Sequence, residues 1–188
     1  MFRNLANKAM TTTGQKACFV IDHLVEALGN EPSSSLRRAL ILADIDQYPG
    51  TTQAGIMERL QIHKSALNRE IDWLFNYGCI VRRESQNDGR AVQLEICGYS
   101  KKAFDTALSY FDGSHENLKV FLEEFGKALK QEKPSLRDAK IVATLYDRKT
   151  ASKQDVIDSL YQGSATTDHR AVNELIEEGL IEDATAHG

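Results

Sequence analysis

Residues 79–96 of this 188-residue chain read Cys-Ile-Val-Arg-Arg-Glu-Ser-Gln-Asn-Asp-Gly-Arg-Ala-Val-Gln-Leu-Glu-Ile. The first five residues are β-prone, residues 86–89 form a turn signal, and residues 91–96 alternate between apolar and polar side chains. This pattern predicts a β-hairpin with a polar tip that carries Arg90. The hairpin decides the fold because helical patterns lie on both sides of it.

Three helical patterns precede the hairpin. The first covers residues 36–48 and ends at Tyr-Pro-Gly, and the second is a short helix that begins after residue 52. The third repeats apolar residues at four- and three-residue spacing over 67–74, and Gly78 is placed for the left-handed residue that follows a helix. Helix, helix, turn, helix and hairpin is the order of the winged helix-turn-helix, whose third helix enters the major groove of DNA. We therefore predict a mainly α fold with a small β-wing.

Two further amphipathic helices are predicted at about residues 15–29 and 114–130, one on each side of this unit. An apolar stripe must be buried against something. The stripe at 114–130 therefore either completes the core of one chain or forms a dimer contact, and the sequence leaves both readings open.

The chain matches itself at an offset of 100 residues. Ser35-Leu36-Arg37 recurs as Ser135-Leu136-Arg137, and apolar positions between 39 and 80 recur between 139 and 181, with one extra residue in the second copy. The shared spacing predicts a tandem fold whose second copy lacks a full wing, and chance similarity between helical sequences is the alternative. Acidic residues gather near the end of this copy, at Glu174, Glu177, Glu178, Glu182 and Asp183. Because carboxylates repel phosphates, the second copy is expected to bind protein rather than DNA.

The charge composition excludes bulk positive charge as the means of binding nucleic acid. The chain has 23 Lys and Arg against 27 Asp and Glu, a formal net charge of −4. The charge is unevenly spread, because residues 36–102 carry 10 basic and 8 acidic groups while residues 134–188 carry 6 and 10. A local basic face on the winged helix is compatible with this distribution.

The sequence lacks the signals that are typical of membrane, secreted and metal-binding proteins and of common enzymes. No run reaches the ~18 apolar residues of a membrane span, and the start has no apolar signal-peptide region, so we expect a cytoplasmic protein without membrane contact. Three cysteines form no disulfide framework, which fits a reducing compartment. The five histidines have no metal-ligand spacing, and no nucleophile or phosphate-loop motif is present. We expect no metal, no cofactor, no catalytic residue and no enzymatic activity.

Residues 36–105 resemble the MarR family of bacterial transcriptional regulators, and the hairpin carries the more specific part of the resemblance. Asp88 and Arg90 match the family's Asp-x-Arg at the tip of the wing, and Gly98 matches the glycine that leads into a long helix. Residues 64–69 fit the start of the family's recognition helix.

The resemblance implies a homodimer in which helices at about 15–30 and 114–131 pair and hold two winged domains over a near-palindromic operator in double-stranded DNA. It also implies a small-molecule effector that binds between these helices and the wings and releases the DNA. The dimer contacts would be Ile21, Leu24, Leu28, Leu118, Phe121, Leu122 and Phe125. The domains would be 1–35 (N-terminal dimerisation region), 36–105 (DNA-binding domain), 106–133 (dimerisation or connecting helix) and 134–188 (second winged-helix-like domain).

The chemistry of the residues fits DNA contact at the third helix and at the hairpin. Ser65, Asn68 and Arg69 offer hydrogen-bond donors to base edges and phosphates. Arg90 at a narrow tip suits the minor groove, with Asp88 holding it or the turn in place. The full set of predicted DNA contacts is Lys64, Ser65, Ala66, Asn68, Arg69, Arg82, Arg83, Asp88 and Arg90. Ordinary solvated charges are the alternative reading.

Trp73 and Cys18 stand apart from this plan. Trp73 lies at a position that is generally polar in the family, and it either fills a local core or docks the second repeat or another protein. Ala17-Cys18-Phe19 faintly resembles the Cys-Phe site of the peroxide-sensing branch of MarR-like regulators, which makes Cys18 a redox candidate. A buried structural thiol is the alternative.

Together these observations predict a sequence-specific DNA-binding transcriptional regulator that represses by occluding a promoter. A protein-docking tandem winged-helix module, as in chromosome-segregation accessory proteins, is the first rival, and the acidic second copy favours it. A plasmid-type replication initiator is the second rival. Directly repeated DNA sites, rather than one palindrome, would identify it.

Overall fold

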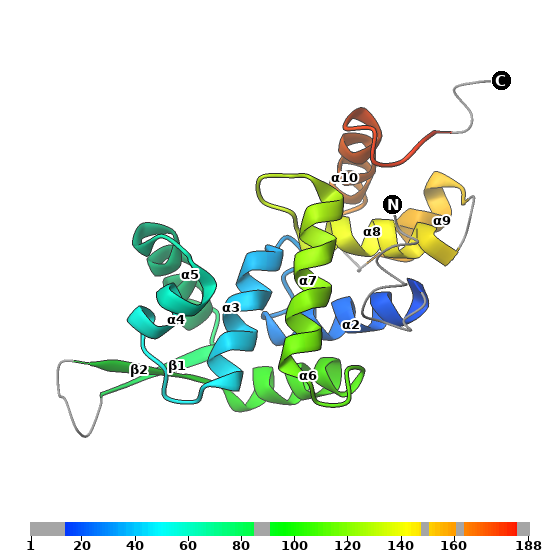
Figure 1. Cartoon of the computed structure of the whole chain (residues 1–188). Coiled ribbons are helices and arrows are strands. Elements are labelled where there is room, and N and C mark those ends of the chain that lie inside the picture. The colour runs from blue at the N-terminus through cyan, green and yellow to red at the C-terminus, as the bar shows by residue number, and fades with distance from the viewer. Residues whose placement is uncertain (1–13, 85–90, 148–150, 161–163, 184–188) are drawn as a thin grey trace.

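The computed structural model describes residues 14–84, 91–147, 151–160 and 164–183, and Figure 1 shows its elements. The helices are α2 (Gly14–Ala27), α3 (Leu36–Gln47), α4 (Gln53–Leu60), α5 (Lys64–Asn76), α6 (Gly98–Ser109), α7 (His115–Leu129), α8 (Leu136–Asp147), α9 (Lys153–Asp158) and α10 (Ala165–Glu177). The strands are β1 (Ile80–Glu84) and β2 (Val92–Ile96). The prediction of a mainly α fold with a small β-wing is confirmed.

The helices α3, α4 and α5 begin at side-chain caps. Ser35 and Thr52 accept hydrogen bonds from the backbone N–H groups three residues further on, and His63 Nδ1 accepts one from the N–H of Ser65. The apolar faces of the three helices meet in a common core. Its fully buried side chains include Ile41, Ile45, Ile56, Leu67, Ile71 and Leu74.

Gly78 turns the chain from α5 into β1. Its φ of +68° lies in the left-handed region, as its place after the third helix predicts. The N–H of Cys79 then donates to the carbonyl of Leu74 at 2.8 Å, which completes the end of the helix.

We expect Gly78→Ala to lower the free energy of unfolding by about 1 kcal/mol, because a residue with a Cβ is disfavoured by this amount in the left-handed region. No atom lies within 4 Å of a Cβ built on Gly78, so a steric clash adds nothing. Gly98 is equally open but has no positive φ, and Gly98→Ala is therefore the matched control. Equal urea midpoints for the two variants would contradict the backbone argument.

The predicted hairpin is present, and it is fastened to the start of α4. The strands β1 and β2 pair antiparallel, with Ile80 opposite Ile96. Thr51 adds a short third member, because its carbonyl accepts from the N–H of Leu94 at 2.8 Å and the N–H of Gly50 donates to the carbonyl of Leu94. The wing is thereby held in a fixed position beside the helix-turn-helix. The tip, residues 85–90, lies outside the described residues.

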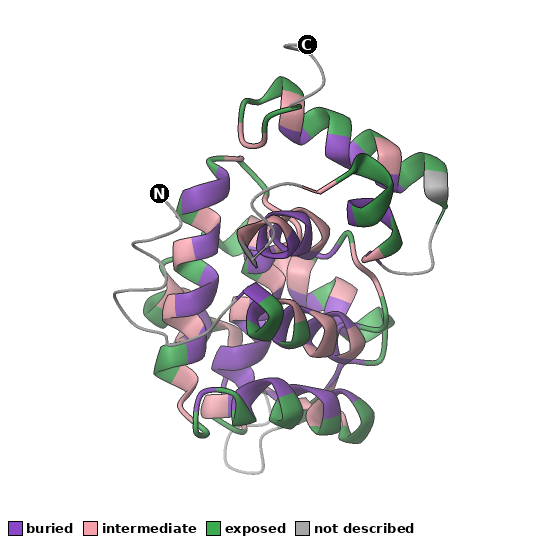
Figure 2. Cartoon of the chain, turned by 90° about the vertical axis from the view of Figure 1, so that its right-hand side faces the viewer, coloured by how far each residue is buried: buried purple, intermediate pink, exposed green. Residues whose placement is uncertain are grey.

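The two flanking amphipathic helices pack inside the single chain. In the middle of Figure 1, α2 lies against α6 and α8, and α7 lies against α3. Figure 2 shows buried residues on the inward sides of the packed helices. The seven side chains predicted to form a dimer contact are all buried here: Ile21, Leu24, Leu28, Leu118, Phe121, Leu122 and Phe125. Helices of the same chain cover their apolar stripes, and their part in a dimer contact stays a prediction that this single chain does not test.

Helix α3 carries two buried carboxylates that hold its neighbours. Asp44 is fully buried and bonds Arg59 of α4 at 2.7 Å and Lys119 of α7 at 3.2 Å. The hydrogen bond to Asp44 is the main reason that the pKa of Arg59 is raised.

Asp46, two residues along α3, bonds two further helices. Its carboxylate lies 2.8 Å from His115 Nε2 of α7 and 3.1 Å from Lys101 Nζ of α6. Buried charges are tolerated when they are paired in this way. The winged helix is therefore fixed to α6 and α7 by polar as well as apolar contacts.

Candidate nucleic-acid interface

The first two turns of α5 present two exposed cations. Lys64 and Arg69 are exposed, and within the described residues no carboxylate lies within 4.0 Å of either charged group. A helix N-terminus also carries a partial positive charge and free N–H groups, both of which favour phosphate. The start of α5 therefore has the electrostatic character that a DNA backbone requires.

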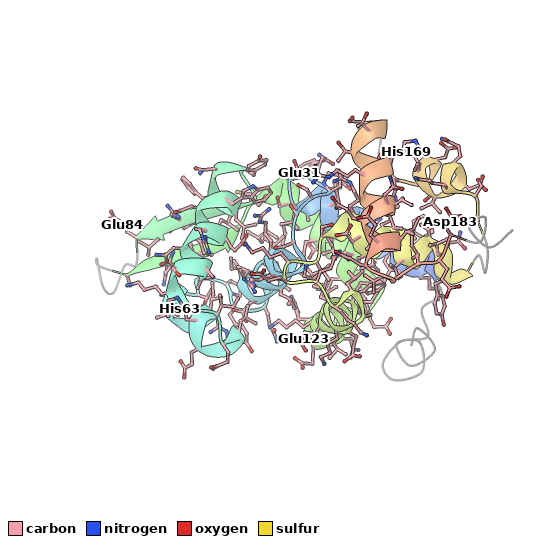
Figure 3. The ribbon with its side chains drawn as sticks, turned by 90° about the horizontal axis from the view of Figure 1, so that it is seen from above. Glu31, His63, Glu84, Glu123, His169 and Asp183 are labelled. Carbon is pink, nitrogen blue, oxygen red and sulfur yellow. The ribbon has the colours of Figure 1, made fainter. Side chains whose placement is uncertain are left out.

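His63 and Ser65 shape this end of the helix. The ring Nδ1 of His63 lies 3.0 Å from the hydroxyl of Ser65 and also faces its backbone N–H at 3.4 Å. Both residues are exposed. The sequence pattern does not reveal the capping role of His63, because the cap position is more often Ser, Thr, Asp or Asn, and His63 is predicted only as one of five surface histidines. Figure 3 shows His63 and Glu84 at the same end of the molecule.

Two of the predicted contact residues on α5 are less accessible. Ala66 and Asn68 are half-buried, and Asn68 Oδ1 is buried without a hydrogen-bond partner among the described residues. A buried polar atom without a partner is uncommon and costs stability. Asn68 therefore faces the protein with one side of its amide, and Ser65 and Arg69 are the better candidates for reading base edges.

The strand arginines are exposed but already paired. Arg82 bonds Asp72 of α5 and lies over the Phe75 ring at 4.7 Å, and Arg83 bonds Glu95 of β2 at 2.8 Å. Exposed ion pairs of this kind contribute little to stability, so a phosphate can replace the carboxylate. The remaining two predicted contacts, Asp88 and Arg90, lie outside the described residues.

Trp73 belongs to a local cluster on the winged helix. Its ring stacks on Tyr77 with centroids 3.9 Å apart, and the Arg38 guanidinium lies 3.8 Å above it. Arg38 also bonds Glu70 at 2.7 Å, so α3 and α5 are joined through this cluster. These ring contacts of Trp73 come from α3 and from its own chain segment, which favours the local-core reading.

We expect Trp73→Ala to lower the free energy of unfolding by about 2 kcal/mol, because the half-buried ring loses apolar contact, stacking and the cation above it. Small-angle scattering should show an unchanged separation of the two ends of the molecule. Phe75→Ala, on the same helix but 43% exposed, is the control and should cost less than half as much. A change in the scattering profile would instead support the docking reading.

The three cysteines lie in different surroundings. Cys18 on α2 is half-buried, with its sulfur 3.5 Å from Thr144 Oγ1 of α8. Cys79 and Cys97 lie at the base of the hairpin, where burial raises the pKa of both thiols. A raised pKa lowers thiolate content and therefore reactivity at these two positions.

A cavity of about 290 Å³ opens between the end of α3, α4 and α7. It is lined by Tyr48, Arg59, Leu60, Glu116, Lys119, Val120 and Glu123. The Arg59 guanidinium and Lys119 Nζ lie 4.2 and 5.6 Å from the Tyr48 ring. The same two cations bond Asp44, so the cavity adjoins the buried charge cluster that joins α3, α4 and α7.

Residues 35–92 match the family model of the MarR family. The match covers α3, α4, α5, β1 and the first residue of β2, about a third of the chain, and it agrees with the resemblance found in the sequence. No curated protein and no solved structure matches the chain. The MarR match favours a regulator over an enzyme, and residues 134–188 lie outside it. Among the described residues, no helix has both the length and the apolar character needed to cross a membrane.

Proposed function

We propose that this protein is a transcriptional regulator that binds double-stranded DNA in a sequence-specific way through α5 and the β-hairpin. The observation that carries the proposal is the pair of exposed cations, Lys64 and Arg69, which have no carboxylate partner among the described residues and lie on the third helix of a MarR-type segment. This helix is the one that a winged helix-turn-helix inserts into the major groove.

Each side chain has a role that follows from its chemistry. Lys64 and the N-terminus of α5 neutralise phosphates and fix the position of the helix. Arg69 reads a base edge, with guanine O6 and N7 as its preferred acceptors, and Ser65 adds a donor or acceptor beside it. Arg82 and Arg83 exchange their carboxylate partners for phosphates, and Arg90 with Asp88 extends the contact from the tip of the wing.

An effector would act through the cavity beside α4. Its cations, Arg59 and Lys119, hold Asp44 and so connect α7 to the helix-turn-helix. An anionic ligand that competes with Asp44 for them would shift α4 relative to α7. Release of DNA by a small molecule follows naturally from such a shift, because α4 and the wing are joined at Thr51.

The rival protein-docking function is favoured by one feature, the acidic end of α10. Glu174, Glu177 and Glu178 are all exposed there. This surface repels DNA and suits a basic protein partner. It leaves the cations of α5 unexplained, which is why DNA binding is the first proposal. A replication initiator would share the DNA surface and differ in recognising direct repeats.

Selection of bound fragments from randomised DNA tests the proposal. The wild-type chain and Arg69→Ala are compared at near-physiological salt, with Arg170→Ala on α10 as the matched control, since both variants remove one exposed arginine. We expect enrichment of a defined sequence by the wild type and by Arg170→Ala, and its loss with Arg69→Ala. No enrichment by the wild type, or equal loss with both variants, would overturn sequence-specific binding through α5.

A further inference from the structure

The starts of α3 and α8 meet in a reciprocal pair of hydrogen bonds. The N–H of Leu36 donates to the carbonyl of Pro134, and the N–H of Leu136 donates to the carbonyl of Ser34, both at 2.9 Å. Ser35 and Ser135 face each other between these bonds as an antiparallel bridge. The two bonds are equivalent, because shifting the residue numbers of each segment by 100 converts one bond into the other. A local twofold axis therefore passes between Ser35 and Ser135.

Backbone details recur along the chain at the same offset. The hydroxyls of Ser35 and Ser135 each accept a hydrogen bond from the N–H three residues further on, both at 3.1 Å. At the starts of α4 and α9, the hydroxyls of Thr52 and Ser152 do the same at 3.3 and 3.1 Å. The helices α3 and α8 both have 12 residues, and α5 and α10 both have 13.

Left-handed residues after the helices recur as well. Asn30 and Lys130 have φ of 59° and 53° after α2 and α7, and Gly78 and Gly179 have φ of 68° and 70° after α5 and α10. Matching left-handed residues are not required by apolar spacing. Chance similarity between helical sequences therefore does not explain them, and the matching unit extends back to include α2 and α7.

The first helix of each unit packs on the second helix of the other unit. Helix α2 lies on α8, where Asp22 bonds Lys140 at 2.7 Å, and α7 lies on α3, where Lys119 bonds Asp44 at 3.2 Å. A second contact follows the same offset. The sulfur of Cys18 lies 3.5 Å from Thr144 Oγ1, and the equivalent positions in the other pair of helices are 118 and 44. Asp44 there bonds Lys119, the neighbour of residue 118. Each unit therefore has its first helix on the far side of the axis, against the other unit.

The two third helices differ in the groups that would face DNA. Lys64 corresponds to Ala165, and Arg69 corresponds to Arg170, which bonds Glu174 at 2.7 Å. Two exposed carboxylates, Glu177 and Glu178, follow near the end of α10. Figure 3 places His63 near the start of α5 and His169 on α10 at opposite ends of the molecule. Of these two ends, the α5 end is the one suited to a phosphate backbone.

We propose that one chain is a complete pair of repeats, residues 14–84 and 114–183, with exchanged first helices, and that this single chain binds a DNA site without twofold symmetry through α5. The part concerning DNA rests on the proposed function. The second repeat takes the place that a second protomer has in a dimeric regulator. The apolar faces of α2 and α7 are covered within the chain, so a second copy is not needed to bury them.

A charge exchange across the α2–α8 contact tests whether the pairing occurs within one chain. Lys140 is 7% exposed, so Asp22→Lys and Lys140→Asp each place like charges together in a restricted space. Each variant is expected to lower the midpoint of thermal unfolding by about 5 °C, and the double variant to recover at least half of the loss. The matched control is the same reversal at Arg170 and Glu174, which is exposed and should change the midpoint by less than about 1 °C.

Mixing the two single variants separates pairing within a chain from pairing between chains. In a dimer with exchanged helices, the lysine introduced at position 22 of one chain would meet the aspartate introduced at position 140 of the other, and the mixture would recover stability at twice the chain mass. We expect no recovery, and a mass of one chain, 21.0 kDa, by light scattering. Recovery in the mixture, or a wild-type mass of two chains, would overturn the single-chain pairing even where a variant fails to fold.

The DNA site supplies the second test. Fragments selected by the wild-type chain should share a sequence without twofold symmetry, and complexes should contain one chain per duplex. Two chains on a palindrome with half-sites about 10 base pairs apart would overturn this inference while leaving the proposed function intact. Absence of any DNA binding would overturn the proposed function and the DNA part of the inference, and the mixing experiment would still decide the pairing of the repeats.

Discussion

Replacing Arg69 with alanine is expected to lower affinity for the selected DNA site by about ten- to hundredfold. A well-placed arginine contact to a base contributes about 1–3 kcal/mol of discrimination. Unlike Arg82 and Arg83, Arg69 has no carboxylate partner among the described residues that would compete with the base for its guanidinium. The loss should be larger for the selected site than for random DNA. Fluorescence anisotropy at fixed salt on both DNAs measures the two losses.

Lys64→Ala separates phosphate binding from base reading on the same helix. It should weaken binding to the selected site and to random DNA by a similar factor, and reduce the slope of log affinity against log salt by about 1. Arg82→Ala is a control on the neighbouring strand, because Arg82 is paired with Asp72 and its removal should cost less than removal of Arg69. An Arg69→Ala loss that is the same on both DNAs would contradict base reading by this residue.

The helix-turn-helix and the hairpin could be predicted because their signals are local. The alternation at 91–96 and the glycine at 78 determine backbone conformation within a few residues, and the structure has the strand pair and the left-handed turn at these places. The exposure of Lys64, Ser65 and Arg69 follows from the same helical spacing, because the buried face is set by Leu67 and Ile71.

The packing of α2 and α7 could not be predicted in the same way. Helical periodicity shows which side chains must be buried, but it does not name the surface that covers them. The stripe of Ile21, Leu24 and Leu28 fits a dimer contact and an internal contact equally well. In the structure α6 and α8 of the same chain cover this stripe, and α8 lies more than 100 residues further along the sequence.

The buried carboxylates of α3 are hidden for another reason. A helix with Asp at 44 and 46 resembles an ordinary surface helix in its sequence, since neither residue shows its partner. Their partners lie on α4, α6 and α7, between 15 and 75 residues away. Only the assembled fold brings Arg59, Lys119 and His115 to them.

Asp44→Ala is expected to lower the free energy of unfolding by about 3 kcal/mol, the largest loss predicted for a single substitution in this chain. Asp44 is fully buried and is the shared partner of Arg59 and Lys119, so its removal leaves two cations in a restricted site. Removing one partner of a buried ion pair costs about 3–5 kcal/mol. The lower end applies here, because the Arg59 side chain is 30% exposed and its guanidinium can reach solvent. Urea unfolding with an unchanged slope would report the loss directly.

A second substitution shows whether the loss comes from the uncompensated charge. Lys119 is 13% exposed, and Lys119→Met keeps its aliphatic length while removing one of the two cations. In the Asp44→Ala background, Lys119→Met should recover about 1 kcal/mol or more, whereas in the wild-type background it should destabilise, because Asp44 then loses a partner. Glu124→Gln, which breaks an exposed pair with Lys127 on α7, is the control and should change stability by less than about 0.5 kcal/mol. A loss that Lys119→Met does not reduce would show that Asp44 acts through packing, since only the charge account predicts that removing a second side chain restores stability.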